Sequence, residues 1–297
     1  MREIRIVVSR HSAFYSPLIA TLAAGFLEKE GWQASYRPLA LAERVPELIA
    51  AGQADVVQSA VSSNWLAMER GETNLPVHFA QINRRDGFFL VERRPDREFH
   101  WRKLEGRTLL ADHAPQPLAM LKYAVRRQGA EWNRIRVLDA GSPEQMAAAF
   151  RAGGDYVHLQ GPAAQQLEHE GVGSVVASVG EAMPPVAFSS LAASRRFLES
   201  EPGEAFLRAY VRARQWVRSA PPEAVAAREA VFFPGCSEAA VATAIARYQA
   251  LGCWEGGAEI PRDLYERALE VFLDGGAITR CWPYEEVVVQ PPAGLAG

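Results

Sequence analysis

The chain has 297 residues, of which 48% are hydrophobic and 23% are charged, and its formal net charge is −3. This length is sufficient for two lobes of ordinary domain size, each with its own apolar core. The near-balanced charge excludes an overall electrostatic attraction to nucleic acid or to an anionic membrane, and no stretch approaches the roughly 18 apolar residues of a membrane-spanning helix.

The chain enters a strand-like segment at Ile4, and no signal peptide is visible before it. Two alternatives follow for its location. The protein is periplasmic if a leader sequence has been left out, and cytoplasmic if Met1 is the native start.

Strands and helices alternate from the start of the chain. A strand over residues 4–9 and a polar, aromatic loop over 11–15 precede a helix with Ser16 as N-cap, which we expect to end at Gly31. A second helix, over residues 43–51, lies between two later strands, and Ser62 or Ser63 can cap a third helix. The later strands of this part are predicted over residues 33–37, 54–58, 77–83 and 88–92.

The charged, proline-containing segment 92–98 is predicted to cross into a second lobe, where the same alternation starts again. Ser142, Pro143 and Gln145 form a capping-box-like helix start there. Strands alternating with helices of this length favour parallel sheets covered by helices. The strands are predicted over residues 107–111, 135–138, 155–159 and 175–178, with a return to the first lobe through 186–192.

Successive amphipathic helices fill the C-terminal part, over residues 202–219, 222–232, 237–251 and 262–273. Their apolar stripes, such as Phe206, Tyr210 and Val217, are expected to pack against the lobes. The tail from Gln290 onward is expected to be loose.

Cysteine and histidine spacing predicts neither a metal site nor a cofactor. Cys236, Cys253 and Cys281 lie far apart and form no C-x-x-C pattern, which favours buried free thiols. His158 and His169 belong to no H-x-H or H-x-x-x-H pattern. The glycines of GVGSVVASVG precede a strand, the reverse of a dinucleotide fingerprint.

Several phrases resemble a known family over nearly the whole chain. They are FYSPLIATLAAGFLEKEGW, ELIAAGQADVVQSA, KLEGRTLLAD, EQMAAAFRAGGDYVHLQGPAAQQLE and IPRDLYERALEVFLDGGAI. They are similar to the substrate-binding proteins of ABC importers in the NMT1/THI5-like family of sulfonate, nitrate and pyrimidine-precursor binders. The resemblance implies a two-lobed α/β fold of the type II periplasmic-binding class. Each lobe would be a mostly parallel sheet flanked by helices, with lobe 1 made of residues 1–92 and 186–297 and lobe 2 of residues 93–185.

The resemblance also implies that the ligand lies between the lobes, at loops following strands. Strand ends of open α/β sheets leave a crevice there, and helix N-termini supply N–H donors. The expected ligand-binding residues are His11, Ser12, Phe14, Tyr15, Ser62, Ser63, Asn64, Asp86, Asp112, His113, Gln116 and Gln160.

Each of these positions also has a purely structural interpretation. Phe14 and Tyr15 can fill the core instead of stacking on a ligand, the serines can act as helix caps, and Asp86 can form a turn with Gly87. Asp86 favours an amine or amidine on the ligand. The helix start beside Asp112 favours an anionic ligand, whereas the Asp112 carboxylate repels one. The sign of the ligand charge therefore stays open. Gln160 departs from the aromatic or acidic residue that relatives often carry there, which leaves that contact in doubt.

Two kinds of enzyme share this scaffold. Pyrimidine synthases carry an active-site lysine and a cysteine-rich motif, and Lys29, Lys103 and Lys122 fall outside the expected loops. Aromatic sulfinate desulfinases use a cleft cysteine, and all three cysteines fall in the C-terminal helical region. A nucleophile and base pair of Ser12 with His113 stays open.

The expected function is therefore binding of a small polar solute, aromatic or heteroaromatic, by hinge closure. The chain would act as the substrate-binding component of an ABC importer, with a permease as partner and no cofactor. The alternative is a cytoplasmic enzyme on the same fold, pyrimidine-synthase-like or desulfinase-like, acting on a small heteroaromatic compound.

Overall fold

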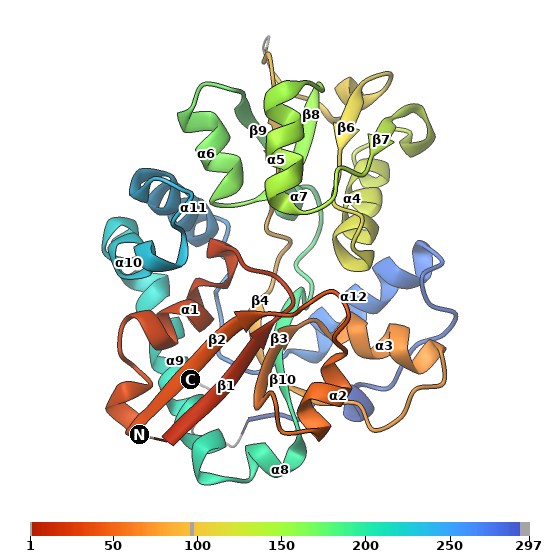
Figure 1. The fold of residues 1–297 in the computed structure, drawn as a ribbon. Helices are drawn as coiled ribbons and strands as arrows, with labels where there is room; N and C mark the ends of the chain where they lie inside the picture. Colours follow the sequence, from red (N-terminus) through yellow and green to blue (C-terminus); the bar gives the residue numbers. More distant parts are fainter. Residues whose placement is uncertain (1, 96–97, 292–297) are drawn as a thin grey trace.

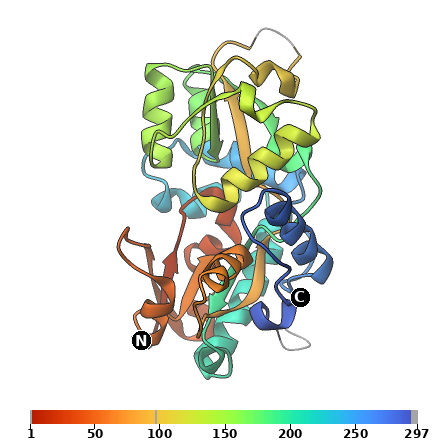
Figure 2. The same cartoon turned by 90° about the vertical axis from the view of Figure 1, so that its right-hand side faces the viewer.

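The computed structural model describes residues 2–95 and 98–291, which form two lobes, each built on a five-stranded mixed sheet (Figure 1). Most of the expected C-terminal tail lies outside the described residues. Figure 2 shows the two lobes stacked one above the other, with the C-terminal helices beside them. The predicted two-lobed α/β fold is confirmed.

The first sheet has the order β2-β1-β3-β10-β4. Strand β10 runs antiparallel to its neighbours β3 and β4, and β1 pairs in parallel with β2 and β3. The strands are β1 (Arg2–Val8), β2 (Trp32–Pro38), β3 (Val56–Ser59), β4 (Val77–Asn83) and β10 (Ser189–Ala193).

The second sheet has the order β7-β6-β8-β5-β9. Strand β5 runs antiparallel to β8 and β9, and β6 pairs in parallel with β7 and β8. The strands are β5 (Phe88–Glu92), β6 (Thr108–Leu110), β7 (Arg136–Leu138), β8 (Tyr156–Gln160) and β9 (Ser174–Ser178).

The first crossing between the lobes comes earlier than we expected. We placed residues 88–92 in the first lobe, but β5 pairs on both edges with strands of the second sheet. The chain therefore crosses at residues 84–87, directly after β4, and returns at residues 183–188, directly before β10. An apolar strand such as FFLVE carries no local signal of which sheet it joins, because its pairing partners are distant in sequence.

Helices cover both sheets. Helices α1 and α9 of the first lobe pack against each other. The helices of the first lobe are α1 (Ser16–Ala23), α2 (Val45–Ala50), α3 (Val61–Glu69), α8 (Arg195–Leu198) and α9 (Glu201–Ser219). Those of the second lobe are α4 (Pro115–Arg127), α5 (Pro143–Ala152), α6 (Ala163–His169) and α7 (Val179–Ala182).

Two helix boundaries differ from the expectation, and one is confirmed. Helix α1 ends at Ala23 instead of near Gly31, because Gly25 adopts a left-handed φ of 71° that breaks the helix. Helix α3 is not capped by Ser62 or Ser63, since its N-cap is Ala60 and both serines lie inside its first turn. The capping box at α5 is present, with Gln145 N–H donating to Ser142 Oγ and Ser142 N–H donating to Gln145 Oε1.

The C-terminal helices contact both lobes. Helix α11 packs against α6 of the second lobe and against the short helix η1 (Ala13–Tyr15) of the first, while α12 contacts α4 and α3. In Figure 1, α11 and α12 lie on opposite sides of the junction between the lobes. These helices are α10 (Pro222–Glu229), η5 (Ala230–Phe232), α11 (Glu238–Ala250), α12 (Arg262–Asp274) and α13 (Tyr284–Val287).

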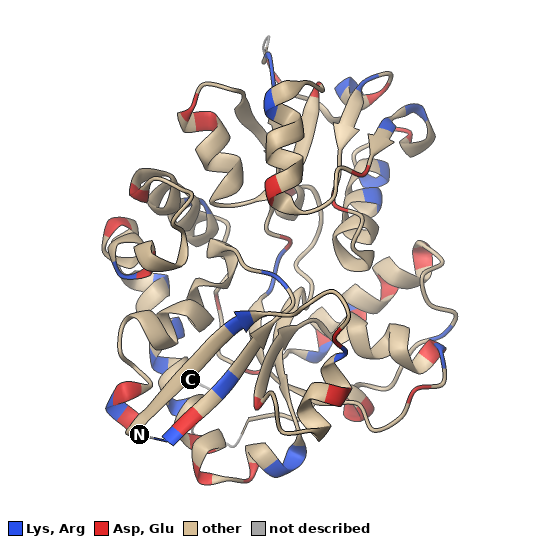
Figure 3. Cartoon of the chain, in the orientation of Figure 1, with Lys and Arg blue, Asp and Glu red and all other residues tan. Residues whose placement is uncertain are grey.

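Charged residues of both signs are interspersed over the two lobes (Figure 3). Within the described residues, no helix has both the length and the apolar character needed to cross a membrane.

Candidate functional site

A pocket of about 370 Å³ lies between the lobes and takes its walls from both of them. We call it the interlobe pocket. Four of the expected residues line it: His11, Ser12, Asp112 and Gln160. Other lining residues, which were not expected at the ligand site, include Arg10, Phe88, Glu144, Arg151, Phe232, Phe233 and Cys236.

The loop after β1 is fixed to the neighbouring strand β3 so that Arg10 reaches the second lobe. The backbone N–H groups of Ser9 and Arg10 donate to the carbonyl and the side-chain oxygen of Gln58, at 3.1 Å each. Arg10 Nη1 then lies 2.5 Å from Asp112 Oδ2, at the end of β6. Both side chains are largely buried, 18% and 7% exposed, so this ion pair ties the lobes together inside the cleft.

His11 contributes its ring to the interlobe pocket but has no free hydrogen-bonding atom. Its Nε2 donates to the carbonyl of Phe232 at 2.7 Å, and its Nδ1 accepts from the hydroxyl of Tyr36 at 2.8 Å. Burial lowers the pKa of His11, so the neutral ring fits both contacts. The ring stacks on Phe233, with 4.8 Å between centroids. Both ring nitrogens are thus engaged within the protein, and the expected hydrogen bonds from His11 to a ligand stay a prediction.

Ser12, Phe14 and Tyr15 are engaged within the protein. Ser12 Oγ donates to the carbonyl of Gly161 in the second lobe at 2.7 Å. Phe14 is fully buried, and Tyr15, 2% exposed, accepts a hydrogen bond from Gln160 Nε2 at 3.3 Å. The core-filling interpretation fits both rings, and neither lines the interlobe pocket.

Ser62 makes a second link between the lobes. Its hydroxyl donates to Gln116 Oε1, and Gln116 Nε2 donates to the carbonyl of Phe188. Ser63 and Asn64 instead face a separate pocket of about 170 Å³. Ser63 donates to the carbonyl of Ala60, and Asn64 to that of Pro76. The structure thus does not bring Ser63 and Asn64 to the interlobe pocket.

Asp86 and His158 lie fully buried near Arg10 and Asp112. Asp86 Oδ1 accepts from the backbone N–H of Phe88 at 2.7 Å, which is the turn interpretation. Asp86 Oδ2 and both ring nitrogens of His158 have no hydrogen-bond partner among the described residues. Burial raises the pKa of Asp86 to about 8 and lowers that of His158 to about 3, so both side chains are mainly uncharged at neutral pH.

Phe88 connects these buried groups to the interlobe pocket. Its ring stacks on His158, with 4.2 Å between centroids, and the guanidinium of Arg10 lies 5.4 Å from the ring centre. Gln160, which pairs with Phe88 across β8 and β5, also lines the pocket, and its buried Oε1 atom has no hydrogen-bond partner among the described residues. Buried polar atoms are normally paired, which makes this wall a candidate for ligand recognition.

Ser12 and His113 do not form a catalytic pair. Ser12 is bonded to Gly161, whereas His113 is exposed, with its Nδ1 donating to the carbonyl of Ala111 at 2.8 Å and lying 3.9 Å from Asp139. His113 does not line the interlobe pocket. Among residues 2–95 and 98–291, no third group orients either of them toward the other.

The three cysteines occupy three different environments, all as free thiols. Cys253 is buried, Cys236 is half-buried in the wall of the interlobe pocket, and Cys281 is exposed. All three lie in the C-terminal helical region as expected, but only Cys253 is buried. Cys236 reaches the cleft because the loop after η5 contacts the second lobe, where the Ser237 N–H donates to Gln166 at 2.8 Å. The described residues contain no group of three or more His, Cys, Asp or Glu side chains that could hold a metal ion.

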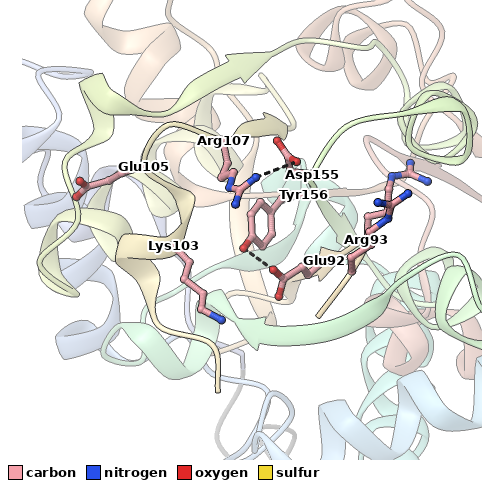
Figure 4. A pocket seen from close by; sticks show the side chains of 8 residues that line it. Glu92, Arg93, Lys103, Glu105, Arg107, Asp155 and Tyr156 are labelled. Carbon is pink, nitrogen blue, oxygen red and sulfur yellow. Dashed lines mark hydrogen bonds and ion pairs between the residues drawn. The ribbon is translucent and has the colours of Figure 1, made fainter. Parts of the chain in front are cut away.

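A larger pocket, of about 560 Å³, lies at the opposite end of the strands of the second sheet (Figure 4). Arg107 and Asp155, which line it, directly precede β6 and β8, so it opens opposite to the strand ends that carry Asp112 and Gln160. Its side chains pair with one another: Tyr156 donates to Glu92 at 2.7 Å, and Arg107 lies 3.8 Å from Asp155. We therefore place the functional site in the interlobe pocket.

Some of the unexpected lining residues could have been predicted from the sequence, and others could not. Arg10 directly precedes the expected loop, and Phe88 directly follows Asp86 and Gly87. Phe232, Phe233 and Cys236 lie more than 200 residues from His11 in sequence and reach it only through the fold.

Comparison with known proteins gives one family and several structures of the same fold. A family model described as NMT1/THI5 like matches residues 13–224. YtlA of Bacillus subtilis (strain 168), a protein named for a binding role, is 23% identical over 293 residues, covering 97% of this chain and 88% of YtlA.

Two solved structures superpose over nearly the full length. The ligand-binding component of an ABC-type import system from Staphylococcus aureus, solved with zinc bound, has a TM-score of 0.78 at 12% identity, covering 100% of this chain and 99% of that one. The periplasmic aliphatic sulphonate binding protein SsuA from Escherichia coli has a TM-score of 0.73 at 16% identity, covering 98% and 93%. At these identities the likeness shows the fold.

Proposed function

The chain belongs to the NMT1/THI5-like family, and we propose that it binds one small organic solute in the interlobe pocket and closes over it, as the solute-binding component of an ABC importer. The observation that carries the proposal is the pocket itself, whose walls come from both lobes. Its volume, about 370 Å³, lies within the range of ordinary small-molecule sites. The binding protein YtlA, the ligand-binding component from Staphylococcus aureus and the sulphonate-binding SsuA support the same function.

The proposed mechanism is hinge closure around the two crossings at residues 84–87 and 183–188. A ligand that touches both lobes stabilises the closed state by the free energy of its contacts with the second lobe. The Arg10–Asp112 and Ser62–Gln116 links set how far the lobes approach. A membrane permease would be the protein partner, recognising the closed form.

The proposed ligand contacts are Phe88 and the paired rings of His11 and Phe233 for a flat ring, with Gln160 for a polar group. Ser12, Asp112 and Gln116 act on closure through the contacts between the lobes. The apolar and aromatic walls suit a small aromatic or heteroaromatic solute.

Native mass spectrometry of freshly purified protein tests the proposal. We expect one small molecule to be retained per chain and released on denaturation. Small-angle scattering should show a larger radius of gyration after the molecule is removed, and recovery when it is added back. A protein that retains nothing and keeps the same dimensions with every ring compound offered would contradict the proposal.

A matched pair of variants locates the site. Gln160→Leu removes a side-chain amide from the pocket wall and should weaken ligand retention by about tenfold, the contribution of one hydrogen bond. Gln215→Leu makes the same change on the exposed face of α9 and should leave retention unchanged. Equal ligand retention by the two variants would mean that the ligand does not bind at Gln160.

A second candidate, an enzyme on this fold, is favoured by one observation: Cys236 lines the interlobe pocket. Burial raises the pKa of the Cys236 thiol, which keeps it protonated and a weak nucleophile at neutral pH. Prolonged incubation with the retained molecule decides between the two. A change in the mass of the molecule that Cys236→Ser abolishes would establish the enzyme.

A further inference from the structure

We infer that the interlobe pocket selects against anionic ligands and that Asp112 determines this selectivity by neutralising Arg10. The inference rests on the proposed function, because it concerns the same pocket. It assigns the ligand to a class, a flat ring compound without net charge.

The charges that line the pocket cancel. Its cationic side chains are Arg10 and Arg151, and its carboxylates are Asp112 and Glu144. Each arginine is already engaged: Arg10 lies 2.5 Å from Asp112, and Arg151 makes two contacts with Glu170, at 2.8 and 2.9 Å. A bound anion would have to displace a carboxylate from one of these arginines.

The Arg10–Asp112 pair is the decisive one because of its burial. Asp112 is 7% exposed and Arg10 18%, whereas Arg151 and Glu170 are 42% and 32% exposed at the rim. Attraction between charges is stronger away from water, so the buried arginine would be the anion-binding group if it were free. Asp112 comes from the second lobe, and closure itself therefore removes that positive charge.

The starts of α5 and α4 supply no substitute for the missing positive charge. The N-terminus of α5 borders the pocket, but Glu144 lies in its first turn and faces the same space. At the start of α4, Asp112 Oδ1 itself accepts the backbone N–H of Ala114 at 2.8 Å. A carboxylate thus offsets the partial positive charge at these two helix starts. The start of α6, a helix of 7 residues, also borders the pocket and has no acidic residue in its first turn.

The other titratable groups in and behind the pocket wall are mainly uncharged. His11 and His158 are neutral rings, and Asp86 is mainly protonated. Gln160 Nε2 donates to Tyr15, and its Oε1 is buried without a hydrogen-bond partner among the described residues. These groups give a sulfonate or carboxylate no compensating attraction.

Matched ring compounds that differ in charge test the inference. The probes are benzenesulfonamide against benzenesulfonate, and benzamide against benzoate, offered to ligand-stripped protein and counted as one-to-one complexes by native mass spectrometry. The wild-type chain should bind the uncharged member of each pair at least about tenfold more tightly, since charge-assisted contacts are of this order.

Asp112→Asn should reverse the preference. Asparagine keeps an oxygen for the Ala114 N–H but releases Arg10, so the affinity for the sulfonate should rise about tenfold to a hundredfold. Asp263→Asn is the matched control, since it removes one negative charge from an exposed position on α12, 3.2 Å from Arg267. It should leave both affinities unchanged.

Several results would overturn the inference. They are tighter binding of the anions by the wild-type chain, an equal gain for both asparagine variants, or no binding of either pair at millimolar concentration. The wild-type preference needs no variant, so it stands even if Asp112→Asn does not fold. A retained ligand that proves to be an anion would refute this inference while leaving the proposed binding function intact.

Discussion

Gly87 lies where the chain first crosses between the lobes, flat against the ring of Phe14. A Cβ atom added at Gly87 would lie 2.3, 2.4 and 2.6 Å from the Cδ2, Cε2 and Cγ atoms of that ring. Real Cβ atoms do not approach other atoms within 3.0 Å, so the shortest of these contacts would have to open by at least 0.7 Å. Gly87→Ala therefore overpacks the junction between the lobes.

Phe14 has little room to move away. It is fully buried, with the rings of Tyr248, Tyr15 and Phe188 at centroid distances of 5.0, 5.4 and 5.5 Å. Overpacking of a rigid core destabilises a protein by about 1–3 kcal/mol, and the upper end applies where neighbours cannot yield. For a chain of this size we expect the melting temperature to fall by about 5 °C at that upper end.

Thermal unfolding followed by circular dichroism measures the effect. The matched control is Gly153→Ala, because no atom lies within 4 Å of its added Cβ and its φ of 176° suits any residue. The control should stay within about 0.5 kcal/mol of the wild-type chain. Phe14→Leu in the same chain should make Gly87→Ala less destabilising than in the wild type. The reasoning fails if the two alanine variants melt together, or if the effects at positions 14 and 87 simply add.

Three further changes have defined outcomes. Asp86→Asn replaces a carboxyl whose pKa is raised by burial from 3.8 to about 8. The wild-type chain should therefore lose stability relative to this variant as the pH rises between these values. Equal differences in urea midpoints at about pH 5 and pH 8 would contradict this. Ser142→Ala removes the capping box of α5 and should lower the free energy of unfolding by about 1 kcal/mol in urea titrations, while an unchanged midpoint would mean that the cap is replaced. Ser62→Ala removes the donor to Gln116 and should enlarge the ligand-free radius of gyration in small-angle scattering, which would stay constant if this link does not hold the lobes together.

Periodicity and capping residues were sufficient to predict most elements. Strands β4 and β5 begin and end at the predicted residues, and the start of α5 is fixed by the local exchange of hydrogen bonds between Ser142 and Gln145. Gly25 shows the limit of such reasoning. Its left-handed φ ends α1 inside a run of apolar residues that otherwise continues the helical repeat.

The candidate site was predictable in position but not in detail. The loops after β1 and β6 do meet, as the Arg10–Asp112 contact shows. The sequence could not show that both ring nitrogens of His11 form hydrogen bonds, with Tyr36 and Phe232, or that Ser12 forms one with Gly161. Free and engaged polar groups look the same in a sequence, since the difference depends on partners far along the chain.

Local chemistry thus determined the alternation of strands and helices, the family resemblance and the edge of the sheets where a ligand can bind. Only the tertiary structure decided which sheet β5 joins, which thiol faces the cleft, and that Arg10 is neutralised by Asp112. The physical reason is the distance along the chain over which each interaction acts. Backbone dihedrals and caps act over a few residues, whereas strand pairing, burial and ion pairing join residues about a hundred or more positions apart, here Arg10 with Asp112 and His11 with Phe232.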